Sequence, residues 1–184
     1  MPPRGPEKPA SLTPAQDRFI AAWGQMGSTW GISRTMAEVH ALLFIVGQPL
    51  CTDDVMERLA ISRGNASMSL RALVDWGIVS REHKRGDRKE YFVAEQEPWA
   101  ILKAVVQERI RREIHPVLAA LAEIRDTTEP ALTGADRADV GDHNRRLDTM
   151  IDVLQTIDQV AEKFLDLPAE ELRQAAADLK GGRS

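Results

Sequence analysis

Apolar residues recur at steps of three and four along most of this chain of 184 residues, which is the period of an amphipathic helix. Serine, threonine or proline stands where most of the predicted helices begin, and these residues favour helix N-termini. The predicted helices start near Thr13, Ser33, Thr52, Ser62, Pro98, Val140 and Pro168. The pattern therefore predicts a mainly α-helical protein.

Two short stretches, residues 78–83 and 89–94, have the composition of β-strands instead. Gly86 and Asp87 lie between them, and such a pair is typical of a hairpin turn. Two short helices joined by a turn and followed by a hairpin are in the order of a winged helix-turn-helix. We therefore predict a mainly α (α+β) fold, in which a winged helix-turn-helix with a two-stranded wing has flanking dimerisation helices.

Composition and periodicity divide the chain into four parts. Residues 1–11 are rich in proline and lack apolar periodicity, which predicts a disordered tail. Residues 12–32 are predicted as an N-terminal helix and loop, residues 33–96 as the winged helix-turn-helix DNA-binding domain, and residues 97–184 as a helical dimerisation region. In the last part, Pro116 should kink the long helix near Arg112, because proline lacks a backbone donor. Residues 127–136 are predicted as a linker.

The overall composition excludes several classes of protein. Hydrophobic residues make up 43% of the chain and charged residues 28%, as in an ordinary globular domain. The single cysteine, Cys51, excludes an intramolecular disulfide. The sequence has no apolar run that could span a bilayer and no secretory signal. We therefore expect a cytoplasmic protein that makes no membrane contact.

Positive charge is concentrated in the predicted hairpin. The formal net charge of the chain is −4, yet residues 81–89 hold five basic and two acidic side chains, a local charge of +3. This is the electrostatic pattern of a nucleic-acid binder, and Lys84, Arg85, Arg88 and Lys89 are the expected DNA contacts. Asp87 either shapes the turn or holds Arg81 or Arg88 in place.

The helix that follows Ser62 has one aliphatic face and one face of small or hydrogen-bonding residues with two arginines. Small side chains permit close approach to a major groove, where asparagine and arginine read base edges. Ser62 is the expected cap and a candidate phosphate ligand. The residues expected to face double-stranded DNA are Ser62, Arg63, Asn65, Ser67, Met68 and Arg71.

Residues 33–94 resemble the winged-helix domain of MarR-type transcriptional regulators. The resemblance rests on residues 61–73, on Trp76-Gly77-Ile78-Val79, and on the wing tip Gly86-Asp87-Arg88-Lys89, where the family's Asp-Arg-Arg signature ends in lysine here. The Ser62-Arg63-Gly64-Asn65 start and Glu97-Pro98-Trp99 are similar to the GbsR-like branch. The resemblance implies a homodimeric DNA-binding regulator, most often a repressor, that binds an inverted repeat. The alternative is a winged-helix module that binds another protein and no DNA.

A heptad pattern runs through residues 140–164, where apolar positions alternate at steps of three and four. Such a pattern predicts a seam between two helices. The predicted dimer seam contains Leu147, Met150, Leu154, Ile157, Ala161 and Phe164. The alternative is that this helix packs inside one subunit against residues 98–129.

Regulators of this type usually switch when a small-molecule effector or an oxidant acts on them. The aromatic residues Trp23, Trp30, Phe44 and Trp99 lie just outside the helix-turn-helix. If they converge, they predict a site for a quaternary ammonium ion held by cation–π attraction; otherwise they are core packing. Cys51 is either an oxidation sensor or an inert structural residue.

Catalytic motifs are absent from the sequence: it has no glycine-rich phosphate loop, no nucleophile elbow and no His-Glu-x-x-His. The Asp53-Asp54 pair stands at a predicted helix start, where capping and the helix dipole explain it. The four histidines lack metal-ligand spacing. We therefore expect no enzyme activity, no cofactor and no metal site.

Overall fold

The computed structural model describes residues 12–128 and 137–181, and they form two compact units. The first unit runs to Ile101 and the second begins at Leu102. The first contains α1 (Leu12–Thr29), α2 (Arg34–Val46), β1 (Leu50–Cys51), α3 (Thr52–Leu59), α4 (Arg63–Asp75), β2 (Val79–His83), β3 (Glu90–Ala94) and the start of α5 (Pro98–Arg109). The second contains the rest of α5, η1 (Ile110–Ile114), α6 (His115–Thr128), α7 (Arg137–Asp166) and α8 (Ala169–Gly181).

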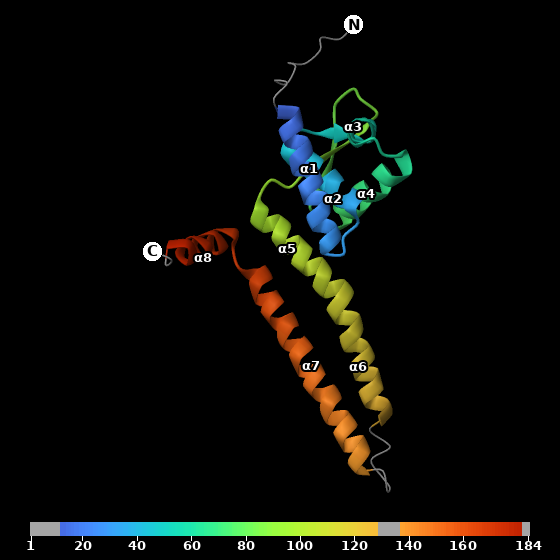
Figure 1. Ribbon diagram of the computed structural model, residues 1–184, viewed down its shortest axis with the longest axis vertical. Coiled ribbons are helices and arrows are strands. Elements are labelled where there is room, and N and C mark those ends of the chain that lie inside the picture. The colour runs from blue at the N-terminus through green and yellow to red at the C-terminus, as the bar shows by residue number, and fades with distance from the viewer. Residues whose placement is uncertain (1–11, 129–136, 182–184) are drawn as a thin grey trace. The chain divides into compact units, whose positions relative to one another are not determined.

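Helix α2 is the centre of the first unit. Val39, Ala41 and Leu42 on this helix are completely buried. Helices α1 and α4 and strand β3 all pack against α2 (Figure 1). Leu70 and Leu73 of α4 and Val55 of α3 complete the same core. The predicted N-terminal helix therefore packs directly on the predicted winged helix-turn-helix.

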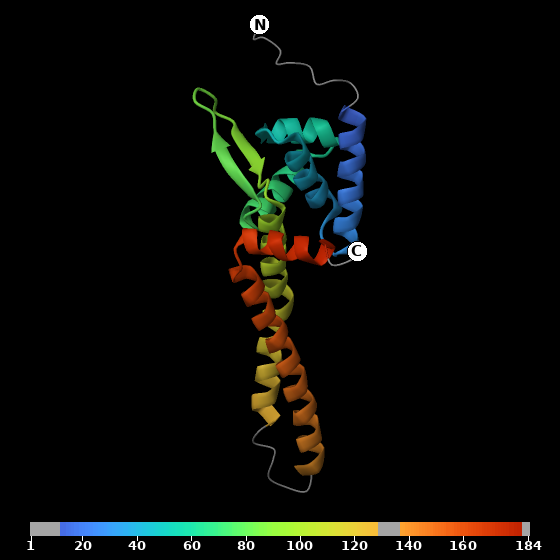
Figure 2. The ribbon, with the colours of Figure 1, turned by 90° about the vertical axis from the view of Figure 1, so that its left-hand side faces the viewer.

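The sheet has three antiparallel strands in the order β1-β3-β2, one more than the two-stranded wing that we predicted. Leu50 and Cys51 add the third strand by pairing with Phe92 and Tyr91 of β3. Strands β2 and β3 form the predicted hairpin, with Val79 opposite Ala94 at its base (Figure 2). A strand of two residues is too short to show an alternating pattern, which explains why the sequence did not reveal β1.

The helix starts follow capping chemistry. Ser33 and Ser62 are the N-caps of α2 and α4, as predicted, and each hydroxyl accepts a hydrogen bond from the backbone N–H three residues later. Helix α3 differs, because its N-cap is Cys51 and not Thr52. There the Asp54 carboxylate accepts a 2.8 Å hydrogen bond from the Cys51 backbone N–H, as in a capping box.

The long helical stretch of the second unit contains a widened turn just before Pro116. Around Arg112, where the kink was predicted, residues Ile110–Ile114 form the π-helix η1, and the His115 backbone N–H donates to the Ile110 carbonyl. Pro116 cannot donate to the Arg112 carbonyl as an α-helix would require, and a π turn redistributes the hydrogen bonds around that gap. Thr127 and Thr128 remain helical, while the rest of the predicted linker and the predicted tail lie outside the described residues.

Helix α7 runs beside η1 and α6 within the same chain (Figures 1 and 2). Polar contacts join the helices along their length: Thr128 Oγ1 donates to Asn144 Oδ1, Arg125 pairs with Asp148 at 2.8 Å, and His115 Nε2 lies 3.0 Å from Asp158. One face of α7 is therefore occupied inside the subunit. No helix in the described ranges is both long and apolar enough to cross a membrane.

Gly27 permits the close approach of α1 to α2. A Cβ atom on Gly27 would lie 2.5 Å from the Cβ of Ala37. We expect Gly27→Ala to lower the free energy of unfolding by about 1–3 kcal/mol, because neither helix backbone can move without disturbing the core. Chemical denaturation monitored by circular dichroism measures this change.

Gly64→Ala is the matched control, because it makes the same substitution in α4 of the same unit. The nearest atom to its added Cβ would be Ser62 Oγ at 3.9 Å, an ordinary contact. We expect this variant to gain up to about 1 kcal/mol of stability from helix propensity. Equal effects of the two substitutions would contradict the proposed close packing of α1 on α2.

Candidate nucleic-acid interface

Helix α4 has one buried and one exposed face, and the predicted DNA contacts lie mainly on the exposed one. Ala66, Leu70 and Leu73 are buried against the core. The side chains of the opposite face reach solvent, and Met68 is 66% exposed. The structure brings Arg63, Asn65, Met68 and Arg71 together as exposed residues, whereas Ser67 is half-buried. Arg71 Nε donates a 3.1 Å hydrogen bond to the Ser67 carbonyl, which fixes the start of this side chain.

The wing presents the predicted basic residues to solvent. Lys84, Arg85, Arg88 and Lys89 are all exposed. A tight turn holds the tip, where the Asp87 backbone N–H donates to the Lys84 carbonyl at 3.0 Å. Gly86 has a φ of 85° in this turn, a conformation that favours glycine. The ammonium group of Lys84 lies 3.8 Å from the centre of the Tyr91 ring, a cation–π geometry.

Asp87 shapes the turn, which is one of the two roles predicted for it. Its carboxylate accepts a 2.9 Å hydrogen bond from the Lys89 backbone N–H and a 2.7 Å hydrogen bond from the Tyr91 hydroxyl. These two bonds, the backbone one first, hold the pKa of Asp87 below its usual value. Arg81 pairs instead with Glu90, at 3.5 Å across the hairpin.

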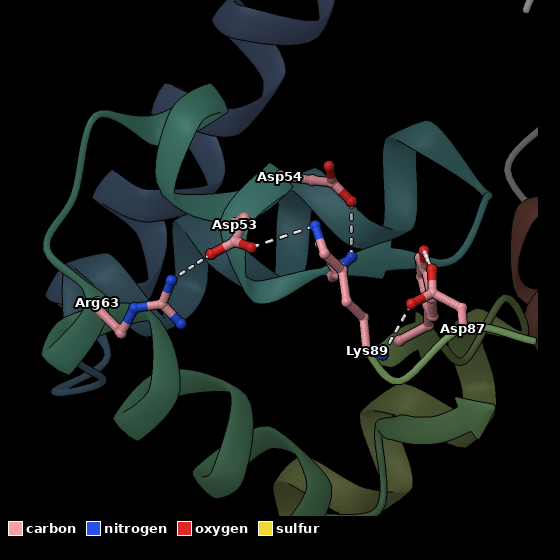
Figure 3. A network of polar contacts seen from close by, with 7 residues as sticks. Asp53, Asp54, Arg63, Asp87 and Lys89 are labelled. Atoms are coloured by element: carbon pink, nitrogen blue, oxygen red, sulfur yellow. Dashed lines mark hydrogen bonds and ion pairs between the residues drawn. The ribbon is translucent and has the colours of Figure 1, made fainter. Parts of the chain in front are cut away.

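Asp53 links the predicted recognition helix to the wing (Figure 3). Its carboxylate pairs with Arg63 of α4 and lies 3.3 Å from the ammonium group of Lys89. The hydrogen bond with Lys89, followed by that with Arg63, lowers the pKa of Asp53. The same contact with Asp53, followed by the nearby Cys51, raises the pKa of Lys89. Sequence reasoning had explained Asp53 by capping and the helix dipole, and did not predict these two ion pairs.

The three partners are solvent-exposed, and this decides how the network can act. Side chains of Asp53, Arg63 and Lys89 are each about half exposed or more. Ion pairs with such exposure contribute little to stability, because water screens them. The contacts therefore orient two cations but do not lock them, so an anionic ligand could take the place of the Asp53 carboxylate.

The predicted dimer seam divides into two groups. Ala161 is buried, and Leu147, Leu154 and Phe164 are half-buried within the single chain. Met150 and Ile157 are exposed, at 52% and 43%. The heptad pattern did not distinguish these groups, because α7 has one apolar stripe toward α6 and another toward solvent.

The aromatic residues proposed for an effector site also divide. Trp23 and Phe44 line one small cavity of about 60 Å³, together with Phe19, His40, Ala41, Pro98 and Ile101. Trp30 is 50% exposed, and Trp99 is outside this lining. Sequence reasoning missed Phe19 and His40, although their spacing from Trp23 and Phe44 along the two predicted helices was a usable signal.

Cys51 is buried where β1 meets α3, with its Sγ 4.0 Å from the ammonium group of Lys89. Its backbone caps α3 and its strand pairs with β3. This position gives Cys51 a structural role at the base of the wing. In the described ranges, no three histidine, cysteine, aspartate or glutamate side chains come together as a potential metal site.

The order of α2, α3, α4 and the hairpin defines a winged-helix protein with an exposed recognition helix and a basic wing. Residues 30–90 match a family model described as MarR family. The HTH-type transcriptional repressor GbsR of Bacillus subtilis (strain 168) is 23% identical over 127 residues, which are 69% of this chain and 70% of that protein.

A solved structure described as a transcriptional regulator has the same fold, with a TM-score of 0.56 and 22% identity over 83% of this chain and 96% of the other. Residues 30–90 thus form a winged-helix domain of the MarR type, and the chain is similar to the repressor GbsR. The resemblance drawn from the sequence is thus confirmed.

Tyr91 is the only tyrosine of the chain, so its titration reports directly on the wing. Its hydrogen bond to Asp87, with a smaller effect of burial, raises the pKa of Tyr91 above its ordinary value. We expect Asp87→Asn to lower this pKa toward the ordinary value of about 10, because the negative charge that opposes phenolate formation is removed. Ultraviolet absorbance of the phenolate, measured against pH, follows the change.

Asp75→Asn is the control, because it removes an equivalent exposed carboxylate at the end of α4. This variant should leave the titration of Tyr91 where it is. An unchanged Tyr91 titration in Asp87→Asn would show that the two side chains are not bonded in solution.

Proposed function

We propose that this regulator binds an inverted-repeat operator in double-stranded DNA as a homodimer and represses transcription. The observation that carries the proposal is the exposed face of α4, where Arg63, Asn65, Met68 and Arg71 stand beside the basic wing. Sequence-specific recognition needs hydrogen-bonding groups on a protruding helix, together with cations for the phosphate backbone. This surface supplies both.

In this proposal, α4 enters the major groove. Asn65 and an arginine read base edges by paired hydrogen bonds, and Met68 offers an apolar contact to a thymine methyl group. Ser62, at the N-terminus of the helix, faces a phosphate. The wing cations Lys84, Arg85, Arg88 and Lys89 contact the flanking backbone, where they release counterions.

Asp53 is the group that DNA phosphate would displace. In the free protein its carboxylate holds Arg63 and Lys89, one cation from each DNA-contacting element. A phosphate bound between these cations would replace the carboxylate as their partner. The wing would then be held by DNA at the same atoms that hold it in the free state.

A solvent-exposed apolar stripe on α7 supports dimer formation. Met150, Val153, Ile157 and Val160 are between 43% and 61% exposed, and Leu167 is 39% exposed. With the half-buried Phe164 they recur at steps of three and four, the pattern of a helix seam. A two-fold dimer through this stripe would present two copies of α4, which matches an operator with two inverted half-sites.

Repression is supported by the similarity to GbsR of Bacillus subtilis, which is a transcriptional repressor. A dimer that covers an operator close to a promoter excludes other proteins from that DNA. The alternative of a protein-binding module would favour an apolar or acidic face on α4. Among the exposed residues of that face, Met68 is apolar and two are arginines.

Two substitutions separate base reading from phosphate contact. We expect Asn65→Ala to lose about 1–3 kcal/mol of operator affinity and to relax the preference for operator over scrambled duplex. We expect Arg88→Ala to weaken binding to both duplexes and to reduce the slope of log K against log salt by about 0.9. Fluorescence anisotropy on duplexes from the DNA upstream of its own coding region, at several salt concentrations, measures both effects.

Arg146→Ala is the control for loss of charge, because Arg146 is an exposed arginine of α7, in the second unit. It should change neither affinity nor slope by a comparable amount. If Asn65→Ala keeps operator choice and affinity, α4 is not the reading helix. If the unchanged protein shows no preference over scrambled DNA, sequence-specific binding at this region is excluded.

The dimer has its own test. We expect Val160→Glu to convert the dimer to a monomer of 20.5 kDa, because it places a charge in the centre of the exposed stripe. Gln159→Glu adds the same charge at the next position, off the stripe, and should leave the dimer intact. Light scattering coupled to size-exclusion chromatography gives the mass. A dimeric Val160→Glu variant would place the interface elsewhere.

A further inference from the structure

Asp53 and Asp54 are neighbours in the first turn of α3, but their carboxylates have different partners. Asp54 accepts the hydrogen bond from the Cys51 backbone N–H that closes the start of the helix. Asp53 instead pairs with Arg63 of α4 and lies 3.3 Å from the ammonium group of Lys89 on the wing (Figure 3). The helix dipole favours an acidic residue at this position, but it does not account for contacts with cations of two other elements.

The negative charge of Asp53 lies in a surface that is otherwise suited to attract DNA. The contacts with Lys89 and then with Arg63 hold the pKa of Asp53 below its usual value, so the carboxylate is ionised at pH 7. Asp87, the acidic residue of the wing tip, is bonded to the Lys89 backbone and to Tyr91 and shapes the turn. Asp53 makes no such contact within the wing. A phosphate that approaches Arg63 and Lys89 therefore meets a like charge, which opposes its binding.

The contacts of Asp53 are weak enough to be replaced, and direct contact is needed to replace them. The side chains of Asp53, Arg63 and Lys89 are 48%, 66% and 55% exposed, so water screens both ion pairs. Coulomb attraction falls with distance, so a phosphate at the longer distance of a loose complex attracts these cations less than the touching carboxylate does. A phosphate in direct contact can replace it. The carboxylate thus disfavours loosely held DNA more than DNA that fits α4 closely.

We propose that Asp53 is a specificity-determining residue, which competes with DNA phosphate for Arg63 and Lys89 and so suppresses binding to DNA that does not fit α4. This inference rests on the proposed function, in which α4 and the wing bind operator DNA. Binding without base readout depends on backbone charge alone, so it is sensitive to such a competitor. Specificity is often gained through a group that disfavours the wrong partner, in addition to contacts with the right one.

Asp53→Asn removes the charge and keeps the size of the side chain. We expect this variant to bind a scrambled duplex about fivefold or more tightly than the unchanged protein does at the same salt concentration. Its affinity for the operator should rise by a smaller factor, so the preference for operator decreases. The slope of log K against log salt should steepen by up to about 0.9, because the surface gains one net positive charge. Fluorescence anisotropy on the full chain measures all three quantities.

Glu57→Gln is the matched control, because Glu57 is an exposed acidic residue one turn further along α3. It changes the net charge by the same amount and should alter either affinity by about twofold at most. A second control removes the two cations. When Arg63 and Lys89 are both alanine, Asp53→Asn should have no larger effect than Glu57→Gln, because the competition has lost its object. Circular dichroism verifies that each variant is folded.

The ion pair in the free protein has a measurement of its own, which needs no DNA. Its contact with Asp53 is the first cause that raises the pKa of Lys89, so it lowers the fraction of reactive free amine. We expect Lys89 to react faster with acetic anhydride in Asp53→Asn, as measured by mass spectrometry of the digested protein. Lys84 of the same wing is the internal control and should react at an unchanged rate.

The competing explanation, that Asp53 positions the two cations for DNA, predicts the opposite result. In that case Asp53→Asn would bind both duplexes more weakly, which would overturn the proposal. Equal effects of Asp53→Asn and Glu57→Gln, an unchanged preference for operator, or an unchanged reaction of Lys89 would overturn it as well. If the unchanged protein binds neither duplex, the proposed function fails and this role fails with it. If the unchanged protein binds the operator selectively and Asp53→Asn gains no affinity for scrambled DNA, the role of Asp53 alone is wrong.

Discussion

The burial of α2 is the constraint on which the winged-helix unit depends. Because α1, α4 and β3 all pack against this one helix, the orientation of α4 follows from the positions of Leu70 and Leu73 in the core. The residues on the opposite face of α4 are therefore exposed to solvent. The same burial lowers the pKa of His40 to about 4, because this residue belongs to the central helix and loses water on every side. Recognition surface and cavity are two consequences of a single packing arrangement.

Electrostatics adds a second level of organisation on top of this packing. The wing would be a loosely attached hairpin if β1 and Asp53 did not connect its base to α3. Strand pairing supplies directional hydrogen bonds, while the exposed carboxylate of Asp53 supplies an exchangeable contact to Lys89. The strand pairing of β1 with β3 thus holds the buried end of the wing firmly, whereas the exchangeable contact of Asp53 with Lys89 lies at the proposed DNA-binding surface. This difference between the two ends suits a wing that must keep its direction and still adjust to DNA.

Local patterns in the sequence predicted most of the fold, and long-range contacts limited the prediction of the site. Helical periodicity located the helices, and Ser33 and Ser62 identified two starts correctly because capping acts over three residues. Asp53 lies in the first turn of α3 as predicted, but its ion pairs were not foreseen, since its partners are ten and thirty-six positions further along the chain. The heptad in α7 predicted a seam, and part of it packs against α6 and η1 of the same chain. Periodicity alone does not distinguish packing within one subunit from packing between two. The convergence of Trp23 and Phe44 without Trp30 and Trp99 depends in the same way on tertiary packing.

The π-helical segment η1 has a consequence for the comparison of relatives. A π turn contains one residue more than the α turn that it replaces, so every position after Ile114 is rotated relative to an uninterrupted helix. A relative with a regular α-helix at this point would therefore present a different helix face after the same number of residues. A relative without proline here should align only with a gap of one residue. The number of residues in this segment, and not which residues they are, would then show whether the helix faces before and after it keep the same relative orientation.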